Sequence, residues 1–338
     1  MKILGIETSC DETAASVVED GRTIISNVVA TQIPFHAEWM GVVPEIASRK
    51  HTEWILPVVR EALDKASLKP GEIDGIAATG RPGLMGSLLV GLTFGKTLSW
   101  SLGKPFIAVN HMLAHLYAAH LAADVSYPYL GLLVSGGHTI ICKVAGYDQI
   151  EVLGTSIDDA AGEAFDKVAK FYNLGYPGGA VIDRLAEKGD PRAAAFPMPS
   201  LHKGEHRYDV SYSGLKTAAI NQIDQFWNPS YPRTDENLAA AFQEAAVKIL
   251  LSRLFRAVED TGLTTVVAGG GVAANSRLRK LLAERTDIEC VFPPLSLCGD
   301  NAAMVAGLGY QYLSRGIVSS FSETASARVE GFRKNGRR

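Results

Sequence analysis

The chain has 338 residues, of which 47% are hydrophobic, and it carries 36 acidic and 33 basic side chains for a formal net charge of -3. This length and this balance suit a globular protein of about two domains. The small net charge gives no overall field that would attract a polyanion, so contact with a nucleic acid would need a local basic patch or a partner protein.

The N-terminal stretch and the cysteines of the chain indicate an intracellular protein. The four cysteines form no C-x-x-C pair, which fits a reducing compartment better than a disulfide framework. The apolar run at the N-terminus is interrupted by Glu7, Asp11 and Glu12 before a signal-peptide core can form. No apolar run reaches the ~18 residues that a membrane span needs. We therefore expect a cytoplasmic protein that makes no contact with a membrane.

Strand and helix patterns alternate along the first part of the chain. Short apolar runs predict strands at residues 3–7, 14–18, 24–30, 73–79 and 106–109, with a polar turn at 8–13. Apolar residues at helical spacing predict helices at 46–63, 88–102 and 111–121. A glycine-rich turn at 80–86 joins a strand to a helix, which is a weak phosphate-binding signature when taken alone.

The same order of elements recurs after Pro128. A strand at 129–134, a glycine turn at 135–137 and a strand at 138–144 are followed later by a strand at 266–268, a glycine turn at 269–271 and a helix at 274–282. Further helices are predicted at 160–171, 181–188, 236–258 and 301–312. The repeat predicts a duplicated α/β fold with two lobes and a central ligand cleft.

The repeat also predicts the domain boundaries. We expect an N-terminal lobe at residues 1–125, to which a C-terminal helix within 300–325 returns. The C-terminal lobe is expected at 126–299, with a helical insertion at 158–232 that is a natural place for specificity. A basic tail at 326–338 follows, and such tails are more often solvated than functional.

Two histidines, His111 and His115, lie four positions apart on a predicted helix. Their imidazoles would share one face of that helix, so they could hold one metal ion, although most such pairs are ordinary surface or core histidines. The spacing is also that of zinc proteases, but Met112 stands where those enzymes have a general-base glutamate. The pair therefore indicates a metal site more than a protease.

The two glycine turns of the second copy can each approach a ligand. The turn around Gly136 and Gly137 offers unhindered backbone N–H groups to a phosphate or carboxylate, and a plain hairpin turn is the alternative. The turn at 269–271 lies where a helix begins, and Asn275 could hydrogen-bond a base or ribose there; tight packing of strand on helix is the alternative.

Acidic residues near predicted helix starts have two possible roles. Asp159, Glu163 and Asp166 are predicted on one helix face, where they would either serve a ligand or cation or form an ordinary solvated face. Asp300 stands just before a predicted helix and can serve as its N-cap.

Blocks of sequence spread over most of the chain resemble, in order, the universal tRNA threonylcarbamoyladenosine transferase family in its bacterial form. The blocks are residues 5–13, 41–45, the pair His111 and His115, 134–139, 158–167 with 176–179, and 268–275 with 300–301. The resemblance implies a duplicated actin-like and sugar-kinase-like α/β fold, which agrees with the repeat.

The resemblance also implies a site. It implies that His111, His115 and Asp300 bind one iron or zinc ion. It implies that the adenylate substrate, which Mg²⁺ can accompany, is bound by Val134, Ser135, Gly136, Gly137, His138, Asp166, Gly179, Asp183 and Asn275. Asp11 and Glu12 are candidates for a general base, with a helix cap or an ion pair as the alternative role. The family often has Glu-Gly where this chain has Leu113-Ala114, so a carboxylate that could support the metal ligands is absent at position 113.

The reaction that the resemblance implies moves a threonylcarbamoyl group from threonylcarbamoyl-adenylate to N6 of the adenosine beside the anticodon, in tRNAs that read codons beginning with A, and releases AMP. Its implied partners are tRNA, a small paralogous dimerisation partner and an accessory ATPase. Two other functions stay open at this point: an ATPase or phosphotransferase on the same fold, and a non-catalytic subunit.

Overall fold

The computed structural model describes residues 1–199 and 206–329, and these form two compact units. The first unit contains Met1–Val125 and the described residues from Pro293 on, and the second contains the described residues of Ser126–Phe292. The first unit is therefore made of two separate segments of the chain, and the second unit lies between them in the sequence. Of the predicted basic tail at 326–338, residues 330–338 lie outside the described residues. No helix among the described residues is long and apolar enough to cross a membrane.

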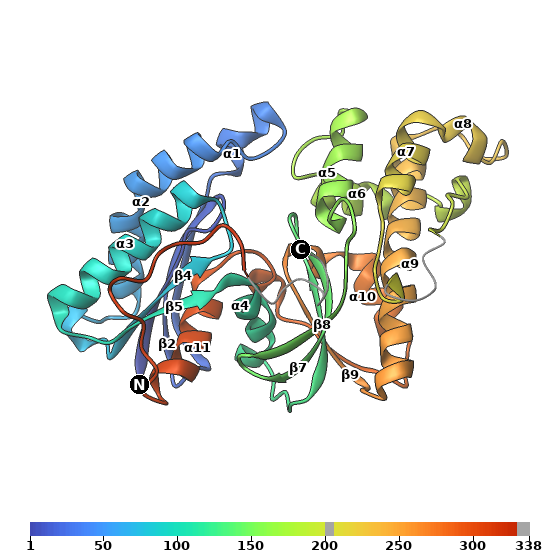
Figure 1. The fold of residues 1–338 in the computed structure, drawn as a ribbon. Coiled ribbons are helices and arrows are strands. Elements are labelled where there is room, and N and C mark those ends of the chain that lie inside the picture. The colour runs from blue at the N-terminus through green and yellow to red at the C-terminus, as the bar shows by residue number, and fades with distance from the viewer. Residues whose placement is uncertain (200–205, 330–338) are drawn as a thin grey trace. The chain divides into compact units, whose positions relative to one another are not determined.

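The first unit is a five-stranded mixed sheet in the order β3-β2-β1-β4-β5, with helices on its faces (Figure 1). Its strands are β1 (Lys2–Glu7), β2 (Glu12–Glu19), β3 (Thr23–Thr31), β4 (Gly75–Arg81) and β5 (Phe106–Asn110). Its helices are α1 (Ile33–His36), α2 (Pro44–Lys65), α3 (Met85–Leu102), α4 (His111–Tyr117) and α11 (Ala302–Leu313).

Strand β1 is the centre of this sheet, antiparallel to β2 and parallel to β4. Both of its faces are covered, which explains why its residues are apolar almost without interruption. Side chains alternate between the two faces of a strand. Leu4 and Ile6 belong to the core that α2 and α3 complete, whereas Gly5 faces α11.

Gly5 is where the C-terminal helix meets the N-terminal strand. A Cβ atom at position 5 would lie 2.3 Å from the Ala302 carbonyl oxygen and 2.6 Å from the Ala306 nitrogen. Glycine therefore lets the α11 backbone lie directly on β1. Gly309 of the same helix approaches Ala77 of β4 in the same way, since a Cβ there would be 2.4 Å from the Ala77 methyl group. Helix α11 is thus fixed along the sheet by two close backbone approaches.

The second unit repeats the sheet of the first. Its order is β10-β9-β6-β7-β8, in which β6 pairs with β7 antiparallel and with β9 parallel, as β1 does with β2 and β4. The strands are β6 (Tyr129–Val134), β7 (Thr139–Gly146), β8 (Gln149–Thr155), β9 (Thr265–Gly269) and β10 (Glu289–Val291). The helices are α5 (Ala161–Phe171), α6 (Gly178–Ala186), α7 (Ser213–Asn221), α8 (Ile223–Phe226), α9 (Asp235–Thr261) and α10 (Ser276–Ala283). The predicted duplication of an α/β layout is therefore confirmed.

Several predicted boundaries are wrong. Strand β2 begins at Glu12, so this residue belongs to a strand and not to the polar turn. The helix that follows β5 is α-helical only to Tyr117 and continues as a 3₁₀ turn to Leu121. The patterns did not predict α1, α7, α8, β8 or β10; α1, α8 and β10 are too short for a periodic signal, and β8 is only partly buried.

The packing at Gly5 gives a first prediction. We expect Gly5→Ala to lower the free energy of unfolding by about 1–3 kcal/mol or more, because the added methyl group would overlap the α11 backbone. Urea unfolding measures this change. Gly71→Ala is the matched control, since a Cβ there meets no atom within 4 Å. Equal stability of the two variants would contradict the packing described for β1 and α11.

Candidate functional site

The two histidines occupy the first and fifth positions of α4. Asn110, the last residue of β5, caps this helix: its Oδ1 accepts hydrogen bonds from the Met112 nitrogen at 2.9 Å and the Leu113 nitrogen at 3.4 Å. The cap fixes where the helix begins, and a spacing of four then places both imidazoles on one face. Both side chains are buried, with His111 9% and His115 1% exposed.

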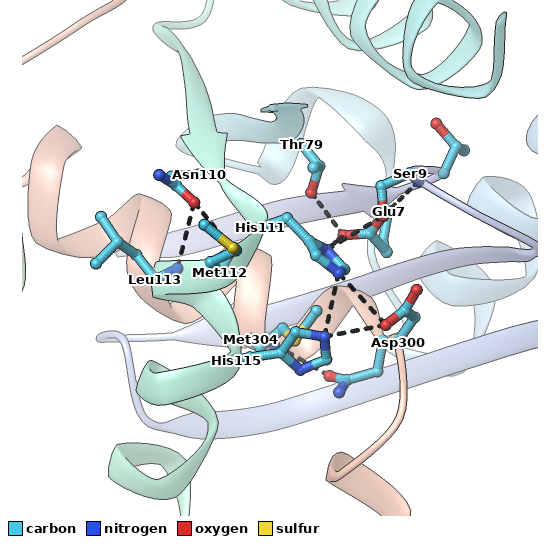
Figure 2. A network of polar contacts seen from close by, with 12 residues as sticks. Glu7, Ser9, Thr79, Asn110, His111, Met112, Leu113, His115, Asp300 and Met304 are labelled. Atoms are coloured by element: carbon cyan, nitrogen blue, oxygen red, sulfur yellow. Dashed lines mark hydrogen bonds and ion pairs between the residues drawn. The ribbon is translucent and has the colours of Figure 1, made fainter. Parts of the chain in front are cut away.

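Asp300 reaches the same point from the other end of the chain. The residue that caps α11 is Asn301, whose Oδ1 accepts from the Met304 nitrogen, so the alternative in which Asp300 serves only as the N-cap is wrong. The Asn301 amide also donates to the carbonyls of Leu297 at 3.2 Å and Gly299 at 2.9 Å. Asn301 thus holds the loop before the helix and leaves the Asp300 carboxylate directed at the histidines, as Figure 2 shows.

The three side chains have the spacing of metal ligands. Nε2 of His115 lies 3.1 Å from Nε2 of His111 and 3.0 Å from Oδ1 of Asp300, and Nε2 of His111 lies 3.5 Å from that oxygen. Atoms bound at ~2.1 Å to one zinc-like ion lie roughly 3.0–3.5 Å from one another. All three ligand atoms fall within 4.8 Å of one another. Two imidazoles and one carboxylate, so arranged, fit a divalent iron or zinc ion.

Charge differs between the two imidazoles. Burial lowers the pKa of His111, but the carboxylates of Glu7 and Asp300 outweigh burial and raise it to about 9. Burial lowers the pKa of His115, and the neighbouring His111 lowers it further. His115 is therefore the neutral member of the pair. Its Nδ1 is buried and has no hydrogen-bond partner among the residues that the structure describes.

A buried glutamate, Glu7, completes this cluster, and the sequence patterns gave it no role. Its Oε2 lies 2.9 Å from Nδ1 of His111, and its side chain is fully buried. Burial raises the pKa of Glu7, but the charge and hydrogen bond of His111, with a hydrogen bond from Thr79, bring it below the ordinary value. The sequence did contain a signal for a role of Glu7, because an acidic residue at the end of a buried apolar strand is unusual unless it has a partner.

The two candidates for a general base lie at the β1–β2 turn and its exit. The Asp11 side chain is largely buried, and its carbonyl accepts a hydrogen bond from the Gln32 nitrogen at 3.0 Å. The Glu12 carboxyl accepts from the Thr31 hydroxyl at 3.2 Å. Burial, together with the charges of Asp300 and Asp11, raises the pKa of Glu12 to about 10. In the metal-free chain Glu12 therefore carries a proton at neutral pH, which suits a proton donor better than a base.

The second unit holds a cavity of about 410 Å³, within the range of small-molecule sites. Of the residues that the sequence predicted to bind the adenylate, those that line this cavity are Gly136, Asp166, Gly179, Asp183 and Asn275. They come from the β6–β7 turn, α5, α6 and the start of α10. The structure thus brings together residues that are up to 139 positions apart in the sequence, from Gly136 to Asn275 (275 − 136 = 139).

Asp183 is held in place by donors on three sides. Its carboxylate accepts hydrogen bonds from the Gln243 amide, from the Asn275 amide at 3.2 Å, and from the Ser276 nitrogen and hydroxyl at 3.1 and 2.8 Å. Asn275 also caps α10 by accepting from the Leu278 nitrogen at 2.9 Å. The carboxylate is therefore fixed at a helix start beside the cavity.

Other predicted adenylate residues do not line the cavity. Val134 is buried in β6, and its carbonyl oxygen lies only 2.3 Å from the position that a Cβ atom of residue 270 would take. Residue 270 is a glycine with φ of +91°, a backbone conformation that other residues rarely adopt. Ser135 closes a hairpin turn by donating from its nitrogen to the His138 carbonyl at 2.8 Å, and its hydroxyl accepts from the His138 nitrogen. Gly137 is exposed in the same turn.

The acidic residues of α5 have separate roles. Asp159 lies before the helix and pairs with Lys167 and Lys216, and Glu163 also pairs with Lys167. These two carboxylates are neutralised within the insertion. Asp166 instead accepts from the Gly178 nitrogen at 2.7 Å and lines the cavity. The expectation that the three share one helix face is therefore wrong for Asp159, which precedes the helix, whereas Glu163 and Asp166 lie three positions apart within it.

Arg184 and Glu187 also line the cavity, and the sequence patterns missed both. Together with Ala180 and Asp183, they follow the three- and four-residue spacing of one face of α6. Once Asp183 had been predicted to bind the substrate, this spacing could have identified Arg184 and Glu187 as its neighbours. The cavity therefore presents both a cation and an anion beside Asp183.

The pKa of His111 predicts a pH dependence of the metal-free chain. A pKa raised from 6.5 to about 9 in the folded state contributes stability that is complete below pH 6.5 and is lost as the pH rises through 9. We expect the free energy of unfolding to fall by up to about 3 kcal/mol over that window. Urea unfolding after chelation measures it. In the His111→Gln variant, the part of the decrease in unfolding free energy that His111 causes should be absent. An identical decrease in the variant and the unaltered protein would contradict the raised pKa of His111.

Solved structures resemble the fold of this chain at low sequence identity. HypF of T. kodakarensis matches with a TM-score of 0.62 and 15% identity, over 94% of this chain and 48% of that one. Such a likeness shows the fold alone. It agrees with the repeated sheet order, and the predicted duplicated, actin-like and sugar-kinase-like α/β fold is confirmed.

Sequence relatives give the family. The model of the tRNA N6-adenosine threonylcarbamoyltransferase family matches residues 23–307. The chain is 74% identical over 337 residues to the tRNA N6-adenosine threonylcarbamoyltransferase of Treponema denticola, covering 100% of both chains. It is 62% identical over 336 residues to the protein of that name from Treponema pallidum, covering 99% of this chain and 96% of the relative. With this likeness over its whole length, the chain belongs to the tRNA N6-adenosine threonylcarbamoyltransferase family.

Proposed function

We propose that this chain transfers a threonylcarbamoyl group from threonylcarbamoyl-adenylate to N6 of the adenosine at position 37, beside the anticodon of tRNAs that read codons beginning with A. The amine nitrogen of N6 forms a bond to the carbamoyl carbon, the bond from that carbon to the phosphate oxygen breaks, and AMP leaves with the bonding electron pair. One proton leaves N6. The family match over the whole chain carries this proposal.

The geometry of the first unit supports a metal dependence. We propose that His111, His115 and Asp300 hold one Fe²⁺ or Zn²⁺ ion, because their ligand atoms have the mutual distances that one such ion requires. A divalent ion with three protein ligands keeps open positions, and it would supply Lewis-acid polarisation of the carbamoyl carbonyl. The protein residues hold the three ligand atoms in that arrangement before the ion binds.

The cavity of the second unit supports binding of the adenylate. Gly136 and Gly179 present backbone without side chains to the cavity, so a phosphate or ribose can approach closely. Asp183, held by Gln243, Asn275 and Ser276, offers acceptor oxygens to ribose hydroxyl groups. Correct positioning of two reactants can lower a barrier by ~7–11 kcal/mol, and we propose that positioning is the main contribution of this chain.

Asp11 and Glu12 are our candidates for handling the proton that leaves N6. A bound divalent cation would lower the pKa of Glu12 from its raised value, because positive charge favours the ionised carboxylate. Glu12 would then accept a proton only when the metal centre is loaded. This role is part of the same proposal.

The proposed partners are those that the family resemblance implies. The chain would act on tRNA in the cytoplasm, together with a small paralogous dimerisation partner and an accessory ATPase, with Mg²⁺ accompanying the nucleotide. A net charge of -3 leaves little attraction for tRNA over the whole chain, so a partner that supplies part of the tRNA contact fits this composition.

One assay separates the three candidate functions. Purified chain is mixed with threonylcarbamoyl-adenylate and unmodified tRNA, with and without the two partner proteins, and the nucleosides are analysed by mass spectrometry after digestion. Modified adenosine is the expected product. Release of γ-phosphate from added ATP by the chain alone, with no modified adenosine in any mixture, would indicate the phosphotransferase, and modification that the partner proteins carry out equally well in a mixture without this chain would indicate a non-catalytic subunit.

His111→Ala tests the metal site. We expect this variant to lose both bound metal and threonylcarbamoyl transfer, because one of three protein ligands disappears. Metal analysis of anaerobically purified protein and the tRNA assay are the measurements. His120→Ala, a histidine outside the ligand group, is the control and should keep both properties. Full metal content and activity in His111→Ala would contradict the site.

Gly179→Leu tests the cavity. A Cβ at Gly179 meets no atom within 4 Å, so the leucine side chain should extend into the cavity without disturbing the fold. We expect Kd for an adenylate analogue to rise at least about tenfold while Tm stays unchanged. Gly214→Leu is the matched control, because it is equally open and near a helix start but does not line the cavity. An unchanged Kd in Gly179→Leu would show that the adenylate binds elsewhere.

A further inference from the structure

Glu7 is a fully buried carboxylate surrounded by hydrogen-bond donors. Its Oε1 accepts from the Ser9 nitrogen at 2.5 Å, and its Oε2 accepts from the Thr79 hydroxyl at 2.6 Å. Both contacts fix the orientation of the carboxylate at the end of β1. The same Oε2 then faces Nδ1 of His111 at 2.9 Å, as Figure 2 shows.

This contact determines which nitrogen of His111 carries hydrogen. An ionised carboxylate acts as an acceptor only, so Nδ1 of His111 must present an N–H group to Glu7. When the ring gives up one hydrogen to bind an ion, the hydrogen on Nδ1 therefore stays, and the lone pair is provided by Nε2, the atom that lies near His115 and Asp300. Ser9 Oγ also lies 3.2 Å from Nδ1, but a hydroxyl can donate or accept and so does not select one tautomer.

We propose that Glu7 is a positioning residue of the metal centre, which holds the His111 ring and its Nδ1 hydrogen so that Nε2 is ready to bind the ion. The inference rests on the metal site proposed above. Leu113 is buried and apolar, so the carboxylate that supports a ligand histidine comes from β1 and not from α4.

An amide in place of the Glu7 carboxylate cannot do what the carboxylate does. In the Glu7→Gln variant, an amide oxygen that faced His111 would leave the amide NH₂ group against the Ser9 nitrogen, which is also a donor. If the amide oxygen faced Ser9 instead, the NH₂ group would donate to Nδ1 and move the hydrogen of His111 to Nε2. Either arrangement loses a buried hydrogen bond or blocks the ligand nitrogen. Changes to carboxylates that support metal-bound histidines typically cost 10–100-fold in metal affinity.

The test measures Zn²⁺ affinity by competition with a chromophoric chelator, at a temperature well below Tm. We expect Glu7→Gln to raise Kd for Zn²⁺ by roughly 10–100-fold. Glu19→Gln, the same change at the end of neighbouring β2, should keep the Kd of the unaltered protein. A role of Glu7 in stability alone would lower Tm but leave Kd unchanged, and that result would overturn the inference.

A second measurement does not depend on whether Glu7→Gln folds. In ¹⁵N spectra of the Zn²⁺-loaded, unaltered chain, His111 should show hydrogen on Nδ1 and metal on Nε2. Metal on Nδ1 would overturn the inference. The His115→Ala variant distinguishes this inference from the proposed metal site. If this variant binds Zn²⁺ as tightly as the unaltered chain, the proposed metal site is wrong, and so is the role of Glu7 that rests on it. If His115→Ala loses Zn²⁺ while Glu7→Gln does not, only the role of Glu7 is wrong.

Discussion

The close approach of α11 to β1 at Gly5 is the constraint on which the candidate metal centre depends. A strand made at the start of the chain and a helix made near its end lie with backbone against backbone, with no side chain between them. Asp300 stands two residues before this helix, and its distance from the histidines follows from where the helix lies. The carboxylate is therefore placed by packing of the sheet and not by the α4 segment that carries the two histidines.

The sequence predicted the local parts of this arrangement well. The histidine spacing, the repeated strand–turn order and the long helices are periodic signals carried by neighbouring residues, and the structure reproduces them. The third proposed ligand was different. Asp300 lies 185 positions after His115, and no local pattern connects two residues so far apart. Only the family resemblance named Asp300, and its own neighbourhood suggested a helix cap that Asn301 in fact provides.

Side-chain roles were harder to predict than elements, for a physical reason. Glu7 ends a buried strand, and its partners Ser9, Thr79 and His111 come from three separate elements. Asp159 and Asp166 looked alike in the sequence, yet one is neutralised by lysines and the other lines a cavity. Which donor meets which acceptor depends on tertiary packing, and hydrophobic periodicity carries no information about it.

The separation of the ligands in the sequence also has a consequence for how the protein is made. Translation at roughly 5–20 residues per second would take roughly 10–40 s to pass from His115 to Asp300. Throughout that interval the nascent chain contains two of the proposed ligands and lacks the carboxylate. The second unit, which lies between them in the sequence, has to be synthesised first. The proposed ligand set is therefore complete only after synthesis has passed Asp300, and a product that stops before that residue lacks the carboxylate.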